Sequence, residues 1–339
     1  MVWAKREENC SGVKSGKGVP TIVSLGEQKF GLCIRTFGGF QLIRGRSVVP
    51  LAEWKLNKSL QLFKYLLVHR GRPISVPQLL GVFWPDMTEQ RGRRNLQATL
   101  YVLRRVLEPN LGAFEGSRYL RHNKGKYTLS LGPSVWLDME VFEHQIRRAE
   151  KVRNDDPDAA REHLRKALKL YQDRFLPEDV YEDWTTYPRE YYHELYVQAT
   201  LEYAQLEAEA GNLRAAIQAC RRALAQDPYQ EEIHRALMMY YLTADRRLEA
   251  IQQYRQCQRM LEQEFGVPPS RETEALYREI IRPRSTVPER LSADANHRPS
   301  VHGAIRPTSS HPTNKQLAGV NKLESARNLS GHDEKLTLR

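Results

Sequence analysis

The sequence predicts a mixed α+β domain followed by an all-α domain of helical repeats, with a disordered segment at each end. Charge and periodicity both support this division. Residues 29–138 hold 18 Lys and Arg against 6 Asp and Glu, and they mix strand-like alternation with helical patterns. Residues 139–282 hold 21 basic against 27 acidic residues, and their apolar pattern repeats at an offset of 34 positions. Residues 1–28 and 283–339 lack periodic apolar residues, so little apolar surface is left to offset the entropy of ordering them.

The first structured residues alternate between apolar and polar types, which is typical of β-strands. Strands are expected over 30–37, 40–43 and 48–51, and together they predict a small antiparallel sheet. A helix is expected over 58–69, with Gly71 supplying the stop. Its apolar face consists of Leu60, Phe63, Leu66 and Leu67.

A short second helix is expected over 76–83. Ser75 and Gln78 form a capping-box pattern in front of it, which satisfies free N–H groups at a helix start. Trp84-Pro85 then breaks the helical pattern and predicts a turn.

The third helix has one apolar and one cationic face. Asp86 is its expected N-cap, with Glu89 three residues on, and the pattern runs to Leu107. At 100° per residue the apolar stripe consists of Leu96, Leu100, Leu103 and Leu107. The opposite side carries Arg94, Ala98, Tyr101 and Arg105, flanked by Arg91, Arg93, Gln97 and Arg104. Gly92 costs roughly 1 kcal/mol relative to Ala, and either lets the backbone approach a phosphate or allows tight contact with the preceding helix.

A basic hairpin is expected next. Residues 119–122 and 126–131 are strand-like and flank Asn123-Lys124-Gly125, a turn in which Asn and Gly tolerate positive φ. Its basic residues are Arg118, Arg121, Lys124 and Lys126. Two capped helices joined by a turn and followed by a basic hairpin predict a winged helix-turn-helix that binds duplex DNA. The alternative for an arginine-rich amphipathic helix is an ordinary solvated surface.

DNA contacts are expected from both elements. Arg94, Gln97 and Tyr101 would approach base edges, since Arg pairs with guanine and Gln with adenine. Phosphate contacts are expected from Arg91, Arg93, Arg104 and Arg105. In the hairpin, Arg121, Lys124 and Lys126 would hold the adjacent backbone or minor groove.

Residues 138–282 are expected to form a short solenoid of tetratricopeptide (TPR)-like helix pairs. Ala216-Ile217 maps onto Ala250-Ile251, and Gly211 onto Asp245, at the offset of 34. Asp138 is a candidate cap for the first helix, and a degenerate pair is expected over 139–152 and 158–171. An aromatic cluster is either an interface anchor or, more commonly, core packing. It comprises Tyr181, Trp184, Tyr187, Tyr191 and Tyr192.

Other classes of protein find little support. The four cysteines show no metal-binding spacing, no leader-like or membrane-spanning apolar run occurs, and a soluble cytoplasmic protein is expected. His193-Glu194 has no second His at metal spacing, and neither a phosphate-binding loop nor a nucleophile-elbow motif is present. We therefore expect no catalytic residues, no metal and no cofactor.

Taken together, the chain resembles the bacterial antibiotic-regulatory-protein (SARP) type of transcriptional activator. That family joins an OmpR/PhoB-type winged helix to a bacterial transcriptional activator domain (BTAD) of TPR-like helices. Two segments carry much of the likeness in the first domain, Gly71–Ser75 and Arg93–Gln97. In the second domain it rests on Phe175–Asp179, Cys220–Leu224 and Phe265–Pro269. Here Lys126 separates a Gly-Tyr pair that is commonly adjacent in the family's hairpin.

The resemblance implies a winged-helix DNA-binding domain over 29–137 and a BTAD over 138–282. It also implies binding to promoter direct repeats, a homodimer on DNA, and recruitment of RNA polymerase at the nucleoid. The competing hypothesis is a TPR-type adaptor whose winged helix contacts protein instead of DNA. The concentration of positive charge in residues 29–138 argues against that hypothesis.

Overall fold

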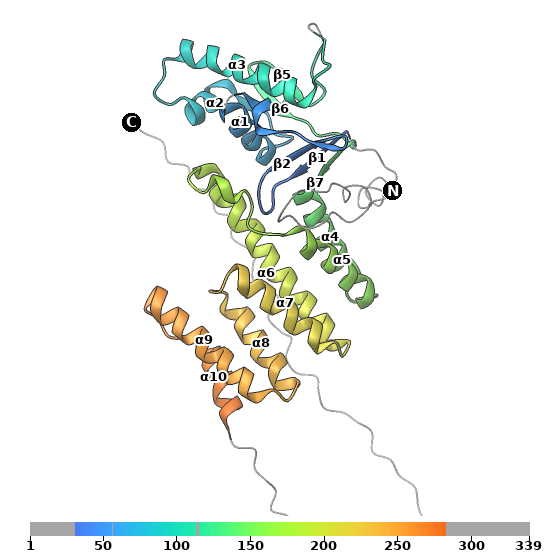
Figure 1. The fold of residues 1–339 in the computed structure, drawn as a ribbon, viewed down its shortest axis with the longest axis vertical. Helices are drawn as coiled ribbons and strands as arrows, with labels where there is room; N and C mark the ends of the chain where they lie inside the picture. The colour runs from blue at the N-terminus through green and yellow to red at the C-terminus, as the bar shows by residue number, and fades with distance from the viewer. Residues whose placement is uncertain (1–30, 56, 113–114, 283–339) are drawn as a thin grey trace, which may run out of the picture. The chain divides into compact units, whose positions relative to one another are not determined.

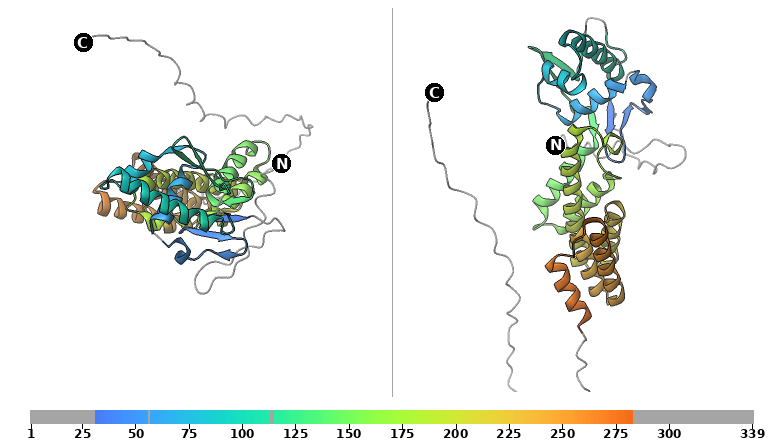
Figure 2. Two further views of the ribbon diagram at one scale, coloured as in Figure 1. Left: turned by 90° about the horizontal axis from the view of Figure 1, so that it is seen from above. Right: turned by 90° about the vertical axis from the view of Figure 1, so that its left-hand side faces the viewer.

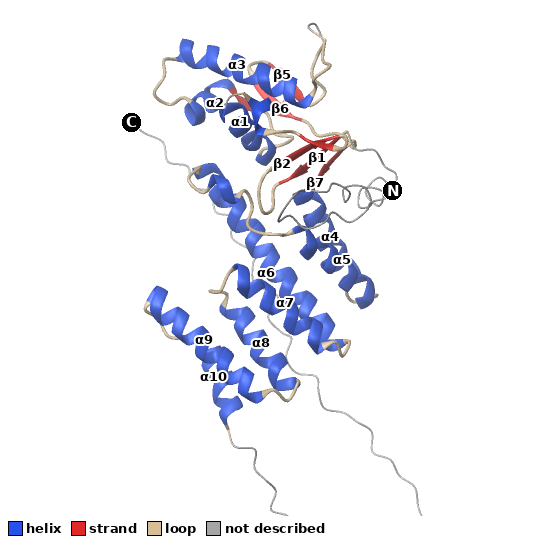
Figure 3. Cartoon of the chain, viewed as in Figure 1, coloured by secondary structure: helices blue, strands red, loops and turns tan. Residues whose placement is uncertain are grey.

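The computed structural model describes residues 31–55, 57–112 and 115–282, and the elements are labelled in Figure 1. Helices and strands are distinguished by colour in Figure 3. The expectations for residues 1–28 and 283–339, and for Phe30, lie outside the described residues. An α+β region comes first and a region of helical pairs follows, as the sequence predicts.

The first sheet contains one strand that the sequence did not reveal. It comprises β1 (Leu32–Arg35), β2 (Gln41–Arg44), β3 (Ser47–Val48) and β7 (Val135–Leu137). The strand order is β3-β2-β1-β7, with β1 antiparallel to β2 and parallel to β7. The prediction of a purely antiparallel sheet is therefore wrong, because β7 returns from about a hundred residues along the chain. All three residues of β7 are buried, as in strands covered on both faces.

The strand predicted over 48–51 is displaced in the structure. The strand itself is β3, and a short 3-10 helix, η1 (Leu51–Trp54), follows it. Trp54 is buried at the end of η1. Its ring lies 5.5 Å from that of Phe63, so aromatic packing takes the chain off the sheet here.

Three helices and a small second sheet complete the α+β region. The helices are α1 (Asn57–Val68), α2 (Val76–Phe83) and α3 (Glu89–Leu107). The sheet has the order β4-β6-β5, from β4 (Ile74–Ser75), β6 (Lys126–Leu129) and β5 (Leu120–Asn123). The predicted apolar face of α1 is buried as expected, and the predicted capping box between Ser75 and Gln78 is present.

The predicted start of α3 is wrong by two residues. Its N-cap is Thr88, which makes no side-chain capping hydrogen bond, and Asp86 lies outside the helix. A turn in which the Met87 N–H donates to the Trp84 carbonyl occupies the intervening positions. The turn forced by Trp84-Pro85 therefore uses residues that the capping pattern had assigned to the helix.

The remaining helices pair in sequence order (Figure 1). They are α4 (Asp138–Val152), α5 (Pro157–Leu170), α6 (Thr186–Glu209), α7 (Leu213–Gln226), α8 (Glu231–Thr243), α9 (Arg247–Phe265) and α10 (Arg271–Ile281). The 34-residue offset is confirmed, since α7 and α9 begin 34 positions apart. Gly211 and Asp245, which the repeat equates, both adopt positive φ, at 82° and 58°. Ala216 and Ala250 are both fully buried.

Asp138 is not the cap of α4. The N-cap position is Leu137, and Asp138 is buried at the start of the helix. Its carboxylate accepts hydrogen bonds from the Thr36 N–H (2.5 Å), the Phe37 N–H (3.0 Å) and the Thr36 hydroxyl (2.8 Å). Burial raises the pKa of this carboxyl, against the opposing effect of those hydrogen bonds. Asp138 therefore fixes the chain that leaves β1 against the first helix of the helical region.

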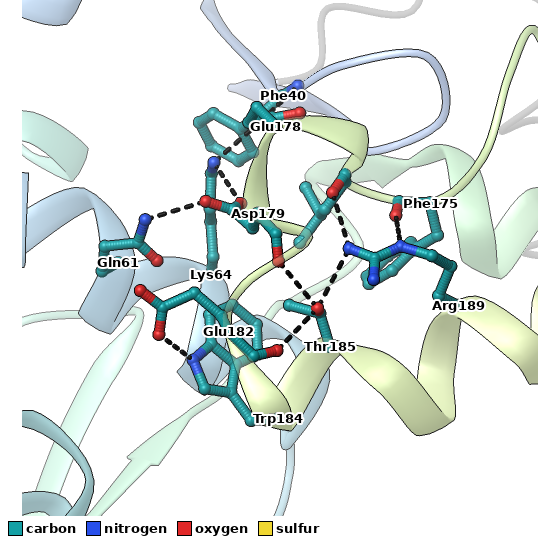
Figure 4. Close-up of polar contacts among 11 residues, drawn as sticks. Phe40, Gln61, Lys64, Phe175, Glu178, Asp179, Glu182, Trp184, Thr185 and Arg189 are labelled. Atoms are coloured by element: carbon teal, nitrogen blue, oxygen red, sulfur yellow. Dashed lines mark hydrogen bonds and ion pairs between the residues drawn. The ribbon is translucent and has the colours of Figure 1, made fainter.

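A buried lysine makes a second connection between the two regions (Figure 4). Lys64 of α1 donates to Asp179 Oδ2 at 2.6 Å and to Glu178 Oε1 at 2.8 Å. Both acids belong to a short 3-10 helix, η2 (Pro177–Asp179). Gln61 and the Phe40 N–H donate to the same two carboxylates. We call this group the buried lysine cluster.

The two regions pack as parts of one compact unit, which includes every described residue. The boundary between 137 and 138 stays a prediction. It separates two kinds of structure in the sequence, and both Asp138 and the buried lysine cluster make contacts across it.

Candidate nucleic-acid interface

One side of α3 is buried and the other is cationic. Its buried residues include the four predicted leucines, each at most 3 % exposed. The exposed members of the other side are Arg91, Arg93, Arg94, Gln97, Tyr101 and Arg105. Arg104 is half-buried. Tyr101 lies among the arginines with 62 % of its surface exposed. We call these seven residues the cationic face.

Two arginines of the cationic face have partners close by. Arg93 Nη2 lies 2.7 Å from Glu89 Oε1, in an exposed pair one helical turn apart. Such pairs contribute only about 0.3–0.5 kcal/mol, so Arg93 remains available to another anion. Arg105 donates from Nη1 to the carbonyls of Pro109 and Leu111, each at 3.1 Å. Arg105 therefore also fastens the chain that leaves the helix.

The hairpin of β5 and β6 is tied to the cationic face. Gln97 Nε2 lies 3.3 Å from the Tyr127 hydroxyl, to which it donates. Tyr127 is buried on β6, and the His122 ring stacks on it at 4.5 Å between centroids. This contact positions the hairpin beside α3, and it engages one amide hydrogen of a side chain predicted to read bases.

The hairpin turn places a lysine at its tip. Lys124 and Gly125 both have positive φ, at 46° and 72°, as a type I′ turn requires. Asn123, one of the two residues expected to tolerate a positive φ in this turn, is the last residue of β5 and pairs with Lys126, so the positive φ falls on Lys124 instead. The predicted basic residues of the hairpin are exposed: Arg118, Arg121, Lys124 and Lys126.

Gly92 faces the core, and the structure favours one of its two explanations. A Cβ at Gly92 would lie 3.1 Å from Leu80 Cδ2 of α2, which is tighter than an ordinary van der Waals contact. Gly92 is buried, whereas Arg91 and Arg93 on either side are exposed. Close packing of α3 on α2 therefore accounts for the glycine.

The acidic helices do not cover the cationic face. Arg91 and Arg94 form no ion pair with any residue in the described part of the chain. In Figure 1 and the right-hand view of Figure 2, α3 and β5 lie at the opposite end of the described unit from α9 and α10. A cationic ridge beside a basic hairpin therefore remains open to solvent.

One exposed residue on this side of α3 was missed by the sequence analysis. Gln90 lies one helical turn before Arg94 and is exposed. The same 100° periodicity that selected Arg94 would have selected it. It lies at the end of α3 from which a recognition helix contacts base edges in helix-turn-helix proteins.

The predicted aromatic cluster divides between packing and exposure. Tyr192 is 5 % exposed, and Trp184 packs edge-on against Tyr65 of α1 at 5.7 Å. Tyr181 and Tyr187 are 98 % and 79 % exposed. Four of the five line a groove of about 900 Å³ beside α1, and Tyr181 does not. The packing interpretation therefore holds for Trp184 and Tyr192.

Two negative findings bear on other functions. Among residues 31–55, 57–112 and 115–282, no group of three or more His, Cys, Asp or Glu side chains is arranged to hold a metal ion. No helix in that part of the chain has both the length and the apolar character to cross a membrane.

Comparison with known proteins agrees with this architecture. A family model described as the bacterial transcriptional activator domain matches residues 137–281. The regulatory protein AfsR of Streptomyces griseus is 25 % identical over 242 residues, which cover 69 % of this chain and 24 % of AfsR. AfsR of Streptomyces coelicolor is 23 % identical over 279 residues, covering 80 % of this chain and 27 % of the relative. The chain thus spans about a quarter of the length of these curated relatives.

A solved structure shows the same fold. Mycobacterium tuberculosis EmbR, determined in complex with a low-affinity phosphopeptide, superposes with a TM-score of 0.63 at 22 % identity. The match covers 75 % of this chain and 65 % of EmbR. It therefore extends over both the α+β region and the helical region. The match to the bacterial transcriptional activator domain over residues 137–281, together with the similarity to AfsR, supports a regulatory protein of the SARP type.

Proposed function

We propose that the chain is a sequence-specific DNA-binding transcriptional regulator whose α2, α3 and β5–β6 hairpin form an OmpR/PhoB-type winged helix. In this proposal residues 29–137 are the DNA-binding domain and residues 138–282 the activator domain. The helix α3 enters the major groove with the cationic face toward the bases, and the hairpin holds the neighbouring backbone. Such a protein acts on the nucleoid, within the cytoplasm.

The exposure of the cationic face is the observation that carries this proposal. A protein that neutralises DNA phosphates needs Lys and Arg side chains that are not already paired with acids of its own. Arg91 and Arg94 form no ion pair with any described residue and fulfil this condition. Arg94 and Tyr101 lie near the middle of the outward side of α3, where base edges would be reached. Arg91, Arg93 and Arg104 lie on the flanks of the outward side of α3, where they would contact phosphates of the DNA backbone.

The partners proposed for the helical region are based only on the resemblance to SARP-type regulators. We propose that the chain binds direct repeats in promoters, pairs with a second copy on the DNA, and contacts RNA polymerase through α4–α10. The helical pairs supply a surface of the kind that binds proteins.

The test is a binding titration by fluorescence anisotropy, using a duplex selected from a random pool and an unrelated duplex. The slope of log Kd against log salt concentration gives the approximate number of phosphates that the protein contacts. Arg94→Ala is expected to cost about 1–3 kcal/mol on the selected duplex and little on the unrelated one. Lys124→Ala is expected to weaken both alike and to lower the salt slope by about one unit. Arg214→Ala, an exposed arginine on α7, is the matched control and should change neither.

Two results would count against the proposal. If Arg94→Ala and Lys124→Ala weaken both duplexes equally, the division between base and phosphate contacts is wrong. If the wild-type chain shows no salt-sensitive duplex binding at all, the adaptor hypothesis, in which this region contacts protein, is favoured.

A further inference from the structure

A small groove in the helical region is lined by cations and by no carboxylate. Its walls are α5, with Arg165 and Lys169, and α7, with Arg222. Its floor is formed by Tyr196, Thr200 and Tyr203 of α6. Leu168, Ala215, Gln218 and Ala219 complete the lining of a space of about 190 Å³. We call this the basic groove.

The charge of the basic groove is opposite to that of its surroundings. Residues 139–282 carry a net charge of −6, from 21 basic and 27 acidic residues. Within them α5 and α7 together hold seven Lys and Arg against two acids, Asp158 and Glu162. The helix between them, α6, holds one arginine and five glutamates. Positive charge is therefore concentrated on the two helices that form the walls.

The cations of the basic groove are only partly neutralised. Arg165 pairs with Glu162 at 2.7 Å, in an exposed pair one helical turn apart. Lys169 and Arg222 form no ion pair with any residue that the structure describes. Glu207 of α6 contacts Arg161 at 3.5 Å and accepts from the Asn212 side chain at 2.9 Å. At least two cations thus remain for an external anion.

The floor of the basic groove is rigid and offers little competition for those cations. Tyr196 is 3 % exposed, and its ring stacks on Tyr171 at 4.2 Å between centroids. The Thr200 hydroxyl donates to the Tyr196 carbonyl at 2.8 Å, so its hydrogen-bonding capacity is partly used within the helix. Ala215 and Ala219 of α7 also line the basic groove, and their short side chains leave space in it. The resulting space admits one or two side chains of a peptide, and a DNA duplex cannot enter it.

We propose that the basic groove binds an acidic segment of a partner protein, with carboxylates paired to Lys169 and Arg222. The pairing is across the groove, because these two residues stand on different walls. A carboxylate between them receives two charged hydrogen-bond donors, which roughly doubles the strength of each contact relative to a neutral hydrogen bond. The inference concerns a surface remote from α3 and does not depend on DNA binding.

The experiment uses the full chain and a short fluorescein-labelled peptide of Asp, Glu and Leu, with the matched Asn, Gln and Leu peptide as its control. Anisotropy is expected to show salt-sensitive binding of the acidic peptide only. Arg222→Glu is expected to weaken that binding by about tenfold or more, because like charges placed together cost several kcal/mol. Arg221→Glu changes charge identically at the adjacent exposed position outside the basic groove, and should alter the affinity less than about twofold.

Circular dichroism melting of each variant establishes that it folds. Equal loss in Arg221→Glu and Arg222→Glu would overturn the proposal, since it would indicate diffuse attraction to a basic surface. Absence of acidic-peptide binding by the wild-type chain would also overturn it. So would a loss of duplex affinity in Arg222→Glu with peptide affinity unchanged, since that result assigns the surface to DNA.

Discussion

Replacing Lys64 by Met tests the buried lysine cluster that joins the two regions. The Lys64 side chain is 2 % exposed and that of Asp179 is 3 % exposed, so their contact at 2.6 Å is a buried ion pair. The Glu178 side chain is 38 % exposed and contributes as a partly solvated partner. Lys64 Nζ also lies 5.2 Å from the centroid of the Phe40 ring. Met keeps most of the apolar length of the side chain but removes the charge and this cation–π contact.

The expected loss follows from the burial of each partner. Removing one member of a buried ion pair costs about 3–5 kcal/mol, because it leaves the other charge uncompensated. The contact with Glu178 adds at most about 1 kcal/mol, since exposed pairs contribute little. Lys64→Met should therefore lower the free energy of unfolding by about 3–5 kcal/mol, and Glu178→Gln by about 1 kcal/mol or less.

The assay is urea unfolding at neutral pH, followed by circular dichroism. The Lys64→Met midpoint should fall by roughly 1–2 M, given the usual dependence of stability on urea. The double variant Lys64→Met with Asp179→Leu removes both charges. It should be only about 1–3 kcal/mol less stable than wild type, a loss that reflects the missing acceptor for Gln61. If Lys64→Met costs less than about 1 kcal/mol, the cluster is not a buried ion pair. The same conclusion follows if the loss of stability in the double variant equals the sum of the losses in Lys64→Met and Asp179→Leu.

Three further perturbations test other contacts. Asp138→Asn should lower the free energy of unfolding by about 2–3 kcal/mol in urea titrations, because the amide nitrogen cannot accept from the backbone N–H groups of Thr36 and Phe37; an unchanged midpoint would contradict this. Gly92→Ala should leave duplex affinity within about twofold while altering stability through contact with α2, and a selective loss of affinity would restore the phosphate-approach explanation. Burial lowers the pKa of His234 below 6.5, so the stability that His234 contributes is present above pH 6.5 and is lost as the pH falls below that value. His234→Gln should therefore flatten the dependence of the urea midpoint on pH below pH 6.5. An unchanged slope would refute this prediction.

Local patterns in the sequence predicted most of the helices. The Ser75–Gln78 capping box and the 34-residue offset each depend on residues close in the chain or on simple repetition, and both appear as expected. The start of α3 was misplaced because Asp86 and Thr88 are both good N-caps. Only the space taken by the turn after Trp84 decides between them.

Contacts between distant residues were not predictable in this way. No local sequence pattern near β7 predicts that this strand pairs with β1, which lies about a hundred residues earlier in the chain. Asp138 precedes an apolar helix and so resembles a cap, but its acceptors serve Thr36 and Phe37. Lys64 occupies a position on α1 where the sequence alone gives no reason to expect a buried charge, since its acidic partners lie more than a hundred residues away.

In the proposed complex α3 lies against duplex DNA with its cationic face toward the duplex, and photo-crosslinking tests this placement most directly. A benzophenone amino acid placed at Tyr101, which is 62 % exposed on that face, is compared with the same group at Tyr181, which is 98 % exposed in the helical region. With the selected duplex, we predict a crosslink from position 101 to bases of the binding site and none from position 181. Crosslinking from position 181, or its absence from position 101 in a complex that still forms, would contradict the account.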